Sequence, residues 1–361
     1  MRFLRLLLVL LLPLSTVSAQ NTPPPQLQPR PATPSVPAAT ANQQIILDVQ
    51  VTAKSGAAIR ELQKQDFTLL DDKQPQNIVS FQAVDSEAVS AADPPVEIVM
   101  VVDAVNASPQ SVSYERGEVK KFLLRNGGKL PQPVSLVVFA DAGTKVQNGS
   151  SRDGNALASL YDQYETGVRS INRSQGYYGA AERLDMSLKT LTEIAEDART
   201  RPGRKLVIWI SPGWPLLTGP DTELSHRDAK QIFNSIVSAS ALLRQARVTL
   251  YSVDPLGVED TAEIRTSYYE EFLKGVASPS RAVPADLSLQ VLAVQSGGRV
   301  ANSSNNLAAE IADCASDASA FYVLSFNASR ADQANEYHSL VVKVDRPDVK
   351  VRTRSGYYAQ P

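Results

Sequence analysis

The chain has 361 residues, of which 43% are hydrophobic, 20% charged and 6% aromatic, with one cysteine, two histidines and a formal charge of −2. These values fit a soluble globular protein of about two domains and exclude collagen-like and coiled-coil chains. The near-neutral charge argues against a nucleic-acid partner, which requires a dominant basic surface. The single cysteine, Cys314, excludes an intrachain disulfide and a zinc site built from several cysteines.

The first 19 residues have the pattern of an export signal. Arg2 and Arg5 precede an unbroken apolar run over 6–12, and 17–19 form the small-residue pattern at which a signal peptidase cleaves. The apolar run is too short for a membrane-spanning helix. We therefore expect residues 1–19 to be a signal peptide, the protein to be secreted or periplasmic, and no membrane insertion after cleavage. Residues 20–42 are rich in proline and predict an extended linker.

Strand patterns occupy both ends of the remaining chain. Apolar residues alternate with polar ones over 45–51, which predicts a half-buried antiparallel strand. Runs at 67–69 and 78–81 flank an Asp-Asp-Lys turn and predict a hairpin. Further strands are expected at 321–326, 340–344 and 349–353. Because neither end has enough strands for a stable layer, we expect residues 43–90 and 319–361 to pack together as a small β-sandwich module.

Between 94 and 318, strands alternate with helices. Nearly continuous apolar runs predict buried strands at 96–102, 134–139, 206–210 and 248–253. Helical periodicity follows them, and Ser108 with Pro109 forms a helix start. The pattern predicts an α/β domain, a doubly wound and mostly parallel sheet, inserted between the terminal strands. Ligands of such sheets bind at the carboxyl ends of the strands, where Asp103 and Ser211 fall.

The order of these elements resembles that of the VWFA-related acidobacterial family of exported proteins. The resemblance is carried by the export signal, the strand module, the buried strand ending in Asp103, the Ile-Trp-Ile-Ser211-Pro-Gly213 turn and the terminal Val-Arg-Thr-Arg-Ser-Gly356-Tyr-Tyr358. It implies a von Willebrand factor type A core and an adhesion-type function. In that class, a metal-ion-dependent adhesion site combines an Asp-x-Ser-x-Ser turn with a Thr and an Asp from two further loops.

Most of these ligands are missing here. Asp103 matches the first turn, but Val105 and Ala107 replace both serines. The second loop, 176–180, has no Thr or Ser, and Pro212 stands where the third loop would supply its carboxylate. Since a hard cation needs several oxygen ligands, we expect a degenerate site that holds no metal, and no cofactor.

Neighbouring polar residues allow two interpretations. Asn106 and Ser108 could supply substitute oxygens for a cation, and Asp141 or Asp254 could approach from adjacent strand ends. The simpler interpretation is structural: backbone N–H groups hold Asp103, Asn106 is a turn residue and Ser108 is a helix cap.

An enzyme is the other alternative. Ser211 follows a buried strand and His226 lies fifteen positions later, which could indicate a hydrolase, although no nucleophile elbow, dinucleotide fingerprint or phosphate-binding loop is present. The simpler interpretation is a tight turn at Ser211 and a solvated helix start at His226. We expect His338 on the surface of its strand and Cys314 as a small buried hydrophobe. On balance, we expect a protein that is not an enzyme.

Aromatic residues on the expected loops suggest either a recognition surface or local core. They are Tyr161, Tyr164, Tyr177, Tyr178 and Trp214. Residues 257–284 have no clear period and could form a recognition loop. We expect an exported interaction module that binds an extracytoplasmic protein without an obligatory divalent cation. The candidate binding residues are Asp103, Asn106, Ser108, Tyr177, Tyr178, Ser211 and Trp214.

Overall fold

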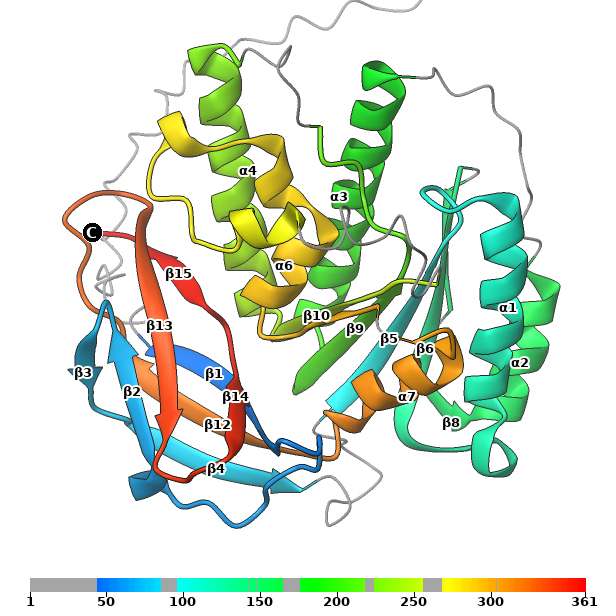
Figure 1. Ribbon diagram of the computed structural model, residues 1–361, viewed down its shortest axis with the longest axis horizontal. Coiled ribbons are helices and arrows are strands. Elements are labelled where there is room, and N and C mark those ends of the chain that lie inside the picture. Colours follow the sequence, from blue (N-terminus) through cyan, green and yellow to red (C-terminus); the bar gives the residue numbers. More distant parts are fainter. Residues whose placement is uncertain are drawn as a thin grey trace, which may run out of the picture. The chain divides into compact units, whose positions relative to one another are not determined.

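A computed structural model describes residues 44–85, 96–141, 143–147, 149–164, 176–217, 224–255, 268–302 and 304–361. The expected signal peptide, the expected linker and residues 257–267 of the expected recognition loop lie outside the described residues. In the part of the chain that is described, no helix is long and apolar enough to cross a membrane. The described residues form one mixed α/β unit with a mostly parallel sheet and two antiparallel sheets (Figure 1).

The seven-stranded sheet contains the apolar runs expected from the sequence. Its order is β11-β10-β9-β5-β6-β7, and β8 also pairs with β6. The first five strands run parallel, whereas β7 and β8 pair antiparallel with β6. The strands are β5 (Val96–Asp103), β6 (Lys129–Ala140), β7 (Gly143–Val146), β8 (Ser151–Asp153), β9 (Arg204–Ile210), β10 (Val248–Val253) and β11 (Val300–Ala301).

Helices cover both faces of this sheet (Figure 1). On one side lie α1 (Pro109–Leu123), α2 (Gly154–Gln163) and α7 (Leu307–Ser316). On the other lie α3 (Tyr177–Arg199), α4 (His226–Gln245) and α6 (Leu289–Gln295). Alternate residues of β5 supply the two cores: Met100 belongs to the first and Val101 to the second. The continuous apolar pattern of β5 follows from this two-sided burial.

The two antiparallel sheets combine strands from both ends of the chain. Their orders are β14-β1-β12-β4 and β15-β13-β2-β3, and side chains of both form one apolar cluster. In the first sheet β1 pairs with β12, so that Ile45 lies opposite Phe326. The strands are β1 (Gln44–Ala53), β2 (Phe67–Asp71), β3 (Gln74–Gln76), β4 (Ser80–Asp85), β12 (Ala320–Asn327), β13 (Glu336–Val344), β14 (Val349–Arg352) and β15 (Gly356–Ala359). Short 3-10 helices are η1 (Lys64–Asp66), η2 (Arg125–Gly128), η3 (Tyr269–Phe272), η4 (Pro279–Arg281) and η5 (Pro284–Leu287).

The expected hairpin between 67–69 and 78–81 is wrong. The turn at Asp72 and Lys73, both with positive φ, connects β2 to the short polar strand β3. Residues 80–85 instead form β4, which pairs with β12 in the other sheet. A two-residue turn with left-handed backbone joins directly adjacent strands, so β3 takes the hairpin position.

The expected surface position of His338 is also wrong. Its side chain is buried and stacks on Tyr357, with ring centroids 5.1 Å apart. His338 shares strand parity with Leu340 and Val342, which face the apolar cluster. Because side chains two residues apart point to the same face, His338 faces inward as well.

Candidate functional site

Asp103 ends β5 at the carboxyl edge of the parallel sheet and is fully buried. Its Oδ1 accepts hydrogen bonds from the backbone N–H groups of Val105 and Asn106, both at 2.9 Å. Its Oδ2 accepts from Asn106 Nδ2 at 2.8 Å and from Trp209 Nε1 at 2.9 Å. Four protein donors therefore surround the carboxyl group.

These donors use the oxygens that a bound cation would need. Burial raises the pKa of Asp103 above its usual value, and the hydrogen bonds from Asn106, Trp209 and Ser211 offset this only in part. A carboxylate can accept all four N–H groups, whereas a protonated oxygen would face a donor with its own proton. Burial thus favours the neutral acid, whereas the four N–H donors favour the carboxylate, whose lone pairs they would occupy.

The neighbouring polar residues Asn106 and Ser108 make hydrogen bonds within the protein. Asn106 donates its amide N–H groups to Asp103 and to Ser187 Oγ, the latter at 3.0 Å. Ser108 caps α1 by accepting from the backbone N–H of Ser111. Asn106 acts as a turn residue and Ser108 as a helix cap in this structure.

The remaining loops do not supply a ligand set. Residues 177–180 begin α3, and the third loop has Pro212 at the position where a carboxylate would be needed. A metal site needs at least three ligand atoms close together. Among the described residues, Asp103, Asp141 and Asp254 belong to no group of three His, Cys, Asp or Glu residues whose ligand atoms lie within 4.8 Å of one another. The residues present do not fit an adhesion-type divalent-cation site, which needs several open oxygens around one ion.

The alternative pair Ser211 and His226 is not brought together by hydrogen bonding. The Ser211 side chain is fully buried, and its Oγ accepts from the backbone N–H of Gly213 at 3.2 Å. His226 begins α4 and is exposed. Within the described part of the chain, no hydrogen bond joins the two residues, so a nucleophile–base pair is not assembled.

A cleft of about 320 Å³ opens beside Asn106 at this edge of the sheet. It is lined by Asn106, Arg183, Pro212, Gly213, Trp214, Pro215, Leu216, Tyr269 and Gln290. Gly213 has a φ of +105°, and a Cβ there would lie 2.3 Å from Gln290 Nε2. Glycine thus permits the close approach of this loop to α6 that shapes one wall.

Several polar groups of this cleft have no protein partner. Trp214 Nε1, Gln290 Oε1 and Asn106 Oδ1 are buried atoms without a hydrogen bond among the described residues. Arg183, half-buried on α3, has no side-chain hydrogen bond or ion pair in the same part of the chain. Buried polar groups are normally satisfied, so these atoms point to a ligand or to ordered water.

The aromatic candidates separate into two groups. Trp214 is 3% exposed and packs edge-on against Trp209, so it belongs to local core while its Nε1 borders the cleft. Tyr161, expected among loop aromatics, lies in α2 and is fully buried. Tyr177 and Tyr178 are 52% and 80% exposed at the start of α3. Among the candidate residues, this last pair presents large aromatic surface to solvent.

Glu115 is a buried acid that the sequence analysis missed. It lies on α1, is fully buried, and neither carboxyl oxygen has a hydrogen-bond partner among the described residues. Burial, assisted by the charges of Asp103 and Asp254, raises the pKa of Glu115 to about 9. Its position between Val112 and Val119, at helical spacings of three and four, was the available signal.

A second buried polar cluster lies in the antiparallel sheets. His338 Nδ1 is 3.1 Å from Asp71 Oδ1 and 3.3 Å from Asp72 Oδ2. Asp71 Oδ2 accepts from Tyr357 Oη at 2.8 Å and from Ser329 Oγ at 3.1 Å. These contacts give each carboxyl oxygen of Asp71 at least one partner inside the protein.

No family model and no curated protein matches the sequence. Similar solved structures include the conserved hypothetical protein BatB from Bacteroides thetaiotaomicron, at 14% identity and a TM-score of 0.29, covering 61% of this chain and 98% of that one. The SpRpn10 VWA domain is similar at 8% identity and a TM-score of 0.25, covering 60% of this chain and 93% of that domain. The pilus adhesin SpaC from Lactobacillus rhamnosus GG is similar at 10% identity and a TM-score of 0.34, covering 83% of this chain. The match covers 49% of SpaC, so this chain spans about half its length. At identities and TM-scores this low, the similarities carry no argument about what this chain does.

Proposed function

We propose that this protein is an exported interaction module that binds an extracytoplasmic protein at the carboxyl edge of its parallel sheet without a divalent cation. Its central domain is von Willebrand factor type A-like, as in the VWFA-related family that the sequence resembles. The observation that carries the metal-free mechanism is the saturation of Asp103, whose two oxygens already accept from four protein donors.

The cleft beside Asn106 favours a carboxylate of the partner. Arg183 supplies a guanidinium, which binds carboxylates through paired N–H groups, and Trp214 Nε1 adds a buried donor. In this mechanism Arg183 provides the positive charge that a cation would provide in a metal-dependent adhesion site. Pro212, Pro215 and Leu216 form apolar walls around it.

The exposed tyrosines extend the proposed surface. Tyr178 lies five residues before Arg183 on α3, which corresponds to about 7.5 Å along the helix axis. Tyrosine is enriched in protein interfaces because it buries much area with few rotatable bonds. The partner would therefore place an acidic group in the cleft and apolar surface on Tyr177 and Tyr178.

A displayed random-peptide library, selected on the mature protein in EDTA, tests this proposal. We expect the selected peptides to contain an essential Asp, Glu or free carboxyl terminus, and their amide forms to bind at least tenfold more weakly. Adding Mg²⁺, Mn²⁺ or Ca²⁺ should change neither affinity nor melting temperature. Binding that requires a cation and is lost in Asp103→Ala would overturn the metal-free mechanism.

Matched variants locate the interaction. Arg183→Gln should weaken peptide binding about tenfold, since it removes one charged partner of the carboxylate. Arg199→Gln, an exposed arginine near the other end of α3, removes the same charge and should leave affinity unchanged. Equal affinities for both variants would show that the cleft is not the binding site.

A further inference from the structure

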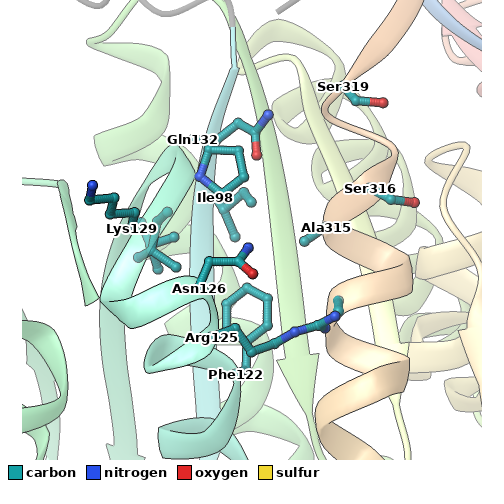
Figure 2. A pocket seen from close by; sticks show the side chains of 13 residues that line it. Ile98, Phe122, Arg125, Asn126, Lys129, Gln132, Ala315, Ser316 and Ser319 are labelled. Carbon is teal, nitrogen blue, oxygen red and sulfur yellow. The ribbon is translucent and has the colours of Figure 1, made fainter. Parts of the chain in front are cut away.

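A second pocket, of about 280 Å³, lies at the opposite edge of the parallel sheet from Asp103 (Figure 2). Its walls include Ile98 near the start of β5, and Leu130 and Val134 in the first half of β6. Because β5 and β6 are parallel, these residues lie at the amino edge. The pocket is therefore separate from the site proposed above and does not depend on it.

The pocket exists because α7 presents small side chains to this part of the sheet. Ala312, Ala315 and Ser316 of α7, with Ser319 just beyond the helix, line one side, facing Phe122 from α1. Alanine and serine cannot span the distance that leucine or phenylalanine fills elsewhere between helix and sheet, so an apolar space remains. Ligand pockets commonly have volumes of about 300–1,000 Å³, so this space suits a single short chain.

The charges at the mouth have one sign. Arg125 and Lys129 are exposed lining residues, and no acidic residue lines the pocket. Among the described residues, neither cation has an ion pair or a side-chain hydrogen bond. Figure 2 shows Arg125 extending from the turn after α1 toward α7, whereas Lys129 points away on the other side. Arg125 is thus the cation placed to meet a ligand's head group.

We propose that this pocket binds a monocarboxylate with a linear apolar tail. The tail would lie against Ile98, Phe122 and Leu130, whose side chains are almost completely buried, and beside the small residues of α7. Burial of methylene groups favours binding in proportion to the apolar area removed from water. The carboxylate would pair with Arg125 at the mouth, where it remains partly hydrated, and Lys129 adds long-range attraction.

Isothermal titration of the mature protein with sodium decanoate tests the proposal. We expect saturable binding at one site per chain. Acetate, which has the head group without the tail, and decyltrimethylammonium, which has the tail with the opposite charge, should each bind at least tenfold more weakly. Absence of saturable decanoate binding, or equal binding of the cationic analogue, would overturn the proposal.

Four variants distinguish this pocket from other surfaces. Arg125→Gln should weaken decanoate binding about tenfold, while Lys343→Gln, an exposed lysine of β13, should not change it. Ala315→Leu should abolish binding by filling the space of the tail. Ala312→Leu fills the same space from a less buried position, so it keeps the test valid if melting curves show that Ala315→Leu does not fold.

Unchanged affinity in a folded variant with leucine at position 312 or 315 would contradict the assignment. Tighter binding of an acetylated peptide ending in leucine than of decanoate would also contradict it, because the occupant would then be a protein terminus.

Discussion

The indole Nε1 of Trp209 donates a hydrogen bond of 2.9 Å to Oδ2 of Asp103, between neighbouring strands β9 and β5. Both side chains are fully buried. An indole N–H cannot dissociate as water or a cation can, so this hydrogen bond to Asp103 is a permanent part of the core. Trp209, in the middle of the apolar Ile-Trp-Ile run, is thus also a hydrogen-bond donor.

Trp209→Phe should lower the free energy of unfolding by about 3 kcal/mol, because it leaves a buried carboxylate oxygen with one donor fewer and opens a small cavity. Trp214→Phe is the matched control. It removes the same atoms from a buried indole whose Nε1 has no protein partner in the described part of the chain, and should cost about 1 kcal/mol. Urea denaturation at neutral pH measures both. Equal losses would mean that the hydrogen bond to Asp103 contributes little.

Much of the parallel sheet could be predicted because its strands are buried on both faces. Such strands are apolar almost throughout, so β5, β9 and β10 stand out in the sequence. The position of Asp103 at a strand end also follows from the sequence, as does the capping role of Ser108. Local patterns sufficed for these features because each depends on residues that are neighbours in the chain.

The parts that could not be predicted depend on partners distant in the chain. Alternation identifies β4 as a strand but does not say which sheet it joins, and pairing with β12 decides that. The cleft requires Arg183, Trp214 and Gln290 from three separate segments. His338 was predictable in principle, since it shares parity with Leu340, but its polarity favoured the surface interpretation.

Glu115 should make stability depend on pH. Burial raises its pKa from 4.5 to about 9, so between these values the folded state holds a proton that the unfolded state releases. The stability associated with the protonated side chain is complete below about pH 4.5, decreases as pH rises, and stops changing above about pH 9. The free energy of unfolding of Glu115→Gln, relative to that of wild type, should therefore increase by up to about 1.4 kcal/mol per pH unit across this window.

The measurement is urea denaturation of wild type and Glu115→Gln from pH 5 to pH 9. Glu182→Gln, on the exposed surface of α3, removes the same charge and should give a curve parallel to that of wild type. A parallel curve for Glu115→Gln as well would show that Glu115 titrates normally in the folded protein.

Tyr357→Phe should destabilise the protein by about 1 to 2 kcal/mol. The change removes the hydroxyl that donates to Asp71 Oδ2 at 2.8 Å and leaves that buried oxygen with Ser329 alone. Packing of the ring against Phe326 and His338 is preserved. Tyr178→Phe, at a tyrosine that is 80% exposed, should change stability by less than about 0.5 kcal/mol. Similar melting temperatures for the two variants would contradict a stabilising role for the Asp71 cluster.

Asp317→Asn should be the most damaging of the single-charge changes in the antiparallel module and its junction with the parallel sheet. Asp317 is 4% exposed, and its Oδ2 accepts from Tyr251 Oη of β10 at 2.8 Å and from Arg352 of β14 at 2.6 Å. One carboxylate thereby joins a strand of the parallel sheet to a strand of an antiparallel sheet. Removing its charge leaves a largely buried guanidinium without its counter-ion, which should cost about 2 to 3 kcal/mol.

The exposed pair of Lys54 and Asp348 provides the comparison, because its side chains are 72% and 73% exposed. Asp348→Asn should cost less than about 0.5 kcal/mol, since solvent screens such pairs and asparagine tolerates the positive φ at this position. Urea unfolding followed separately by tryptophan fluorescence, which reports on the parallel sheet, and by far-ultraviolet circular dichroism should give coincident transitions for wild type. If the carboxylate joins the sheets into one cooperative unit, both transitions of Asp317→Asn should shift together to lower urea concentration. A shift no larger than that of Asp348→Asn would show that the buried pair contributes little to holding the sheets together.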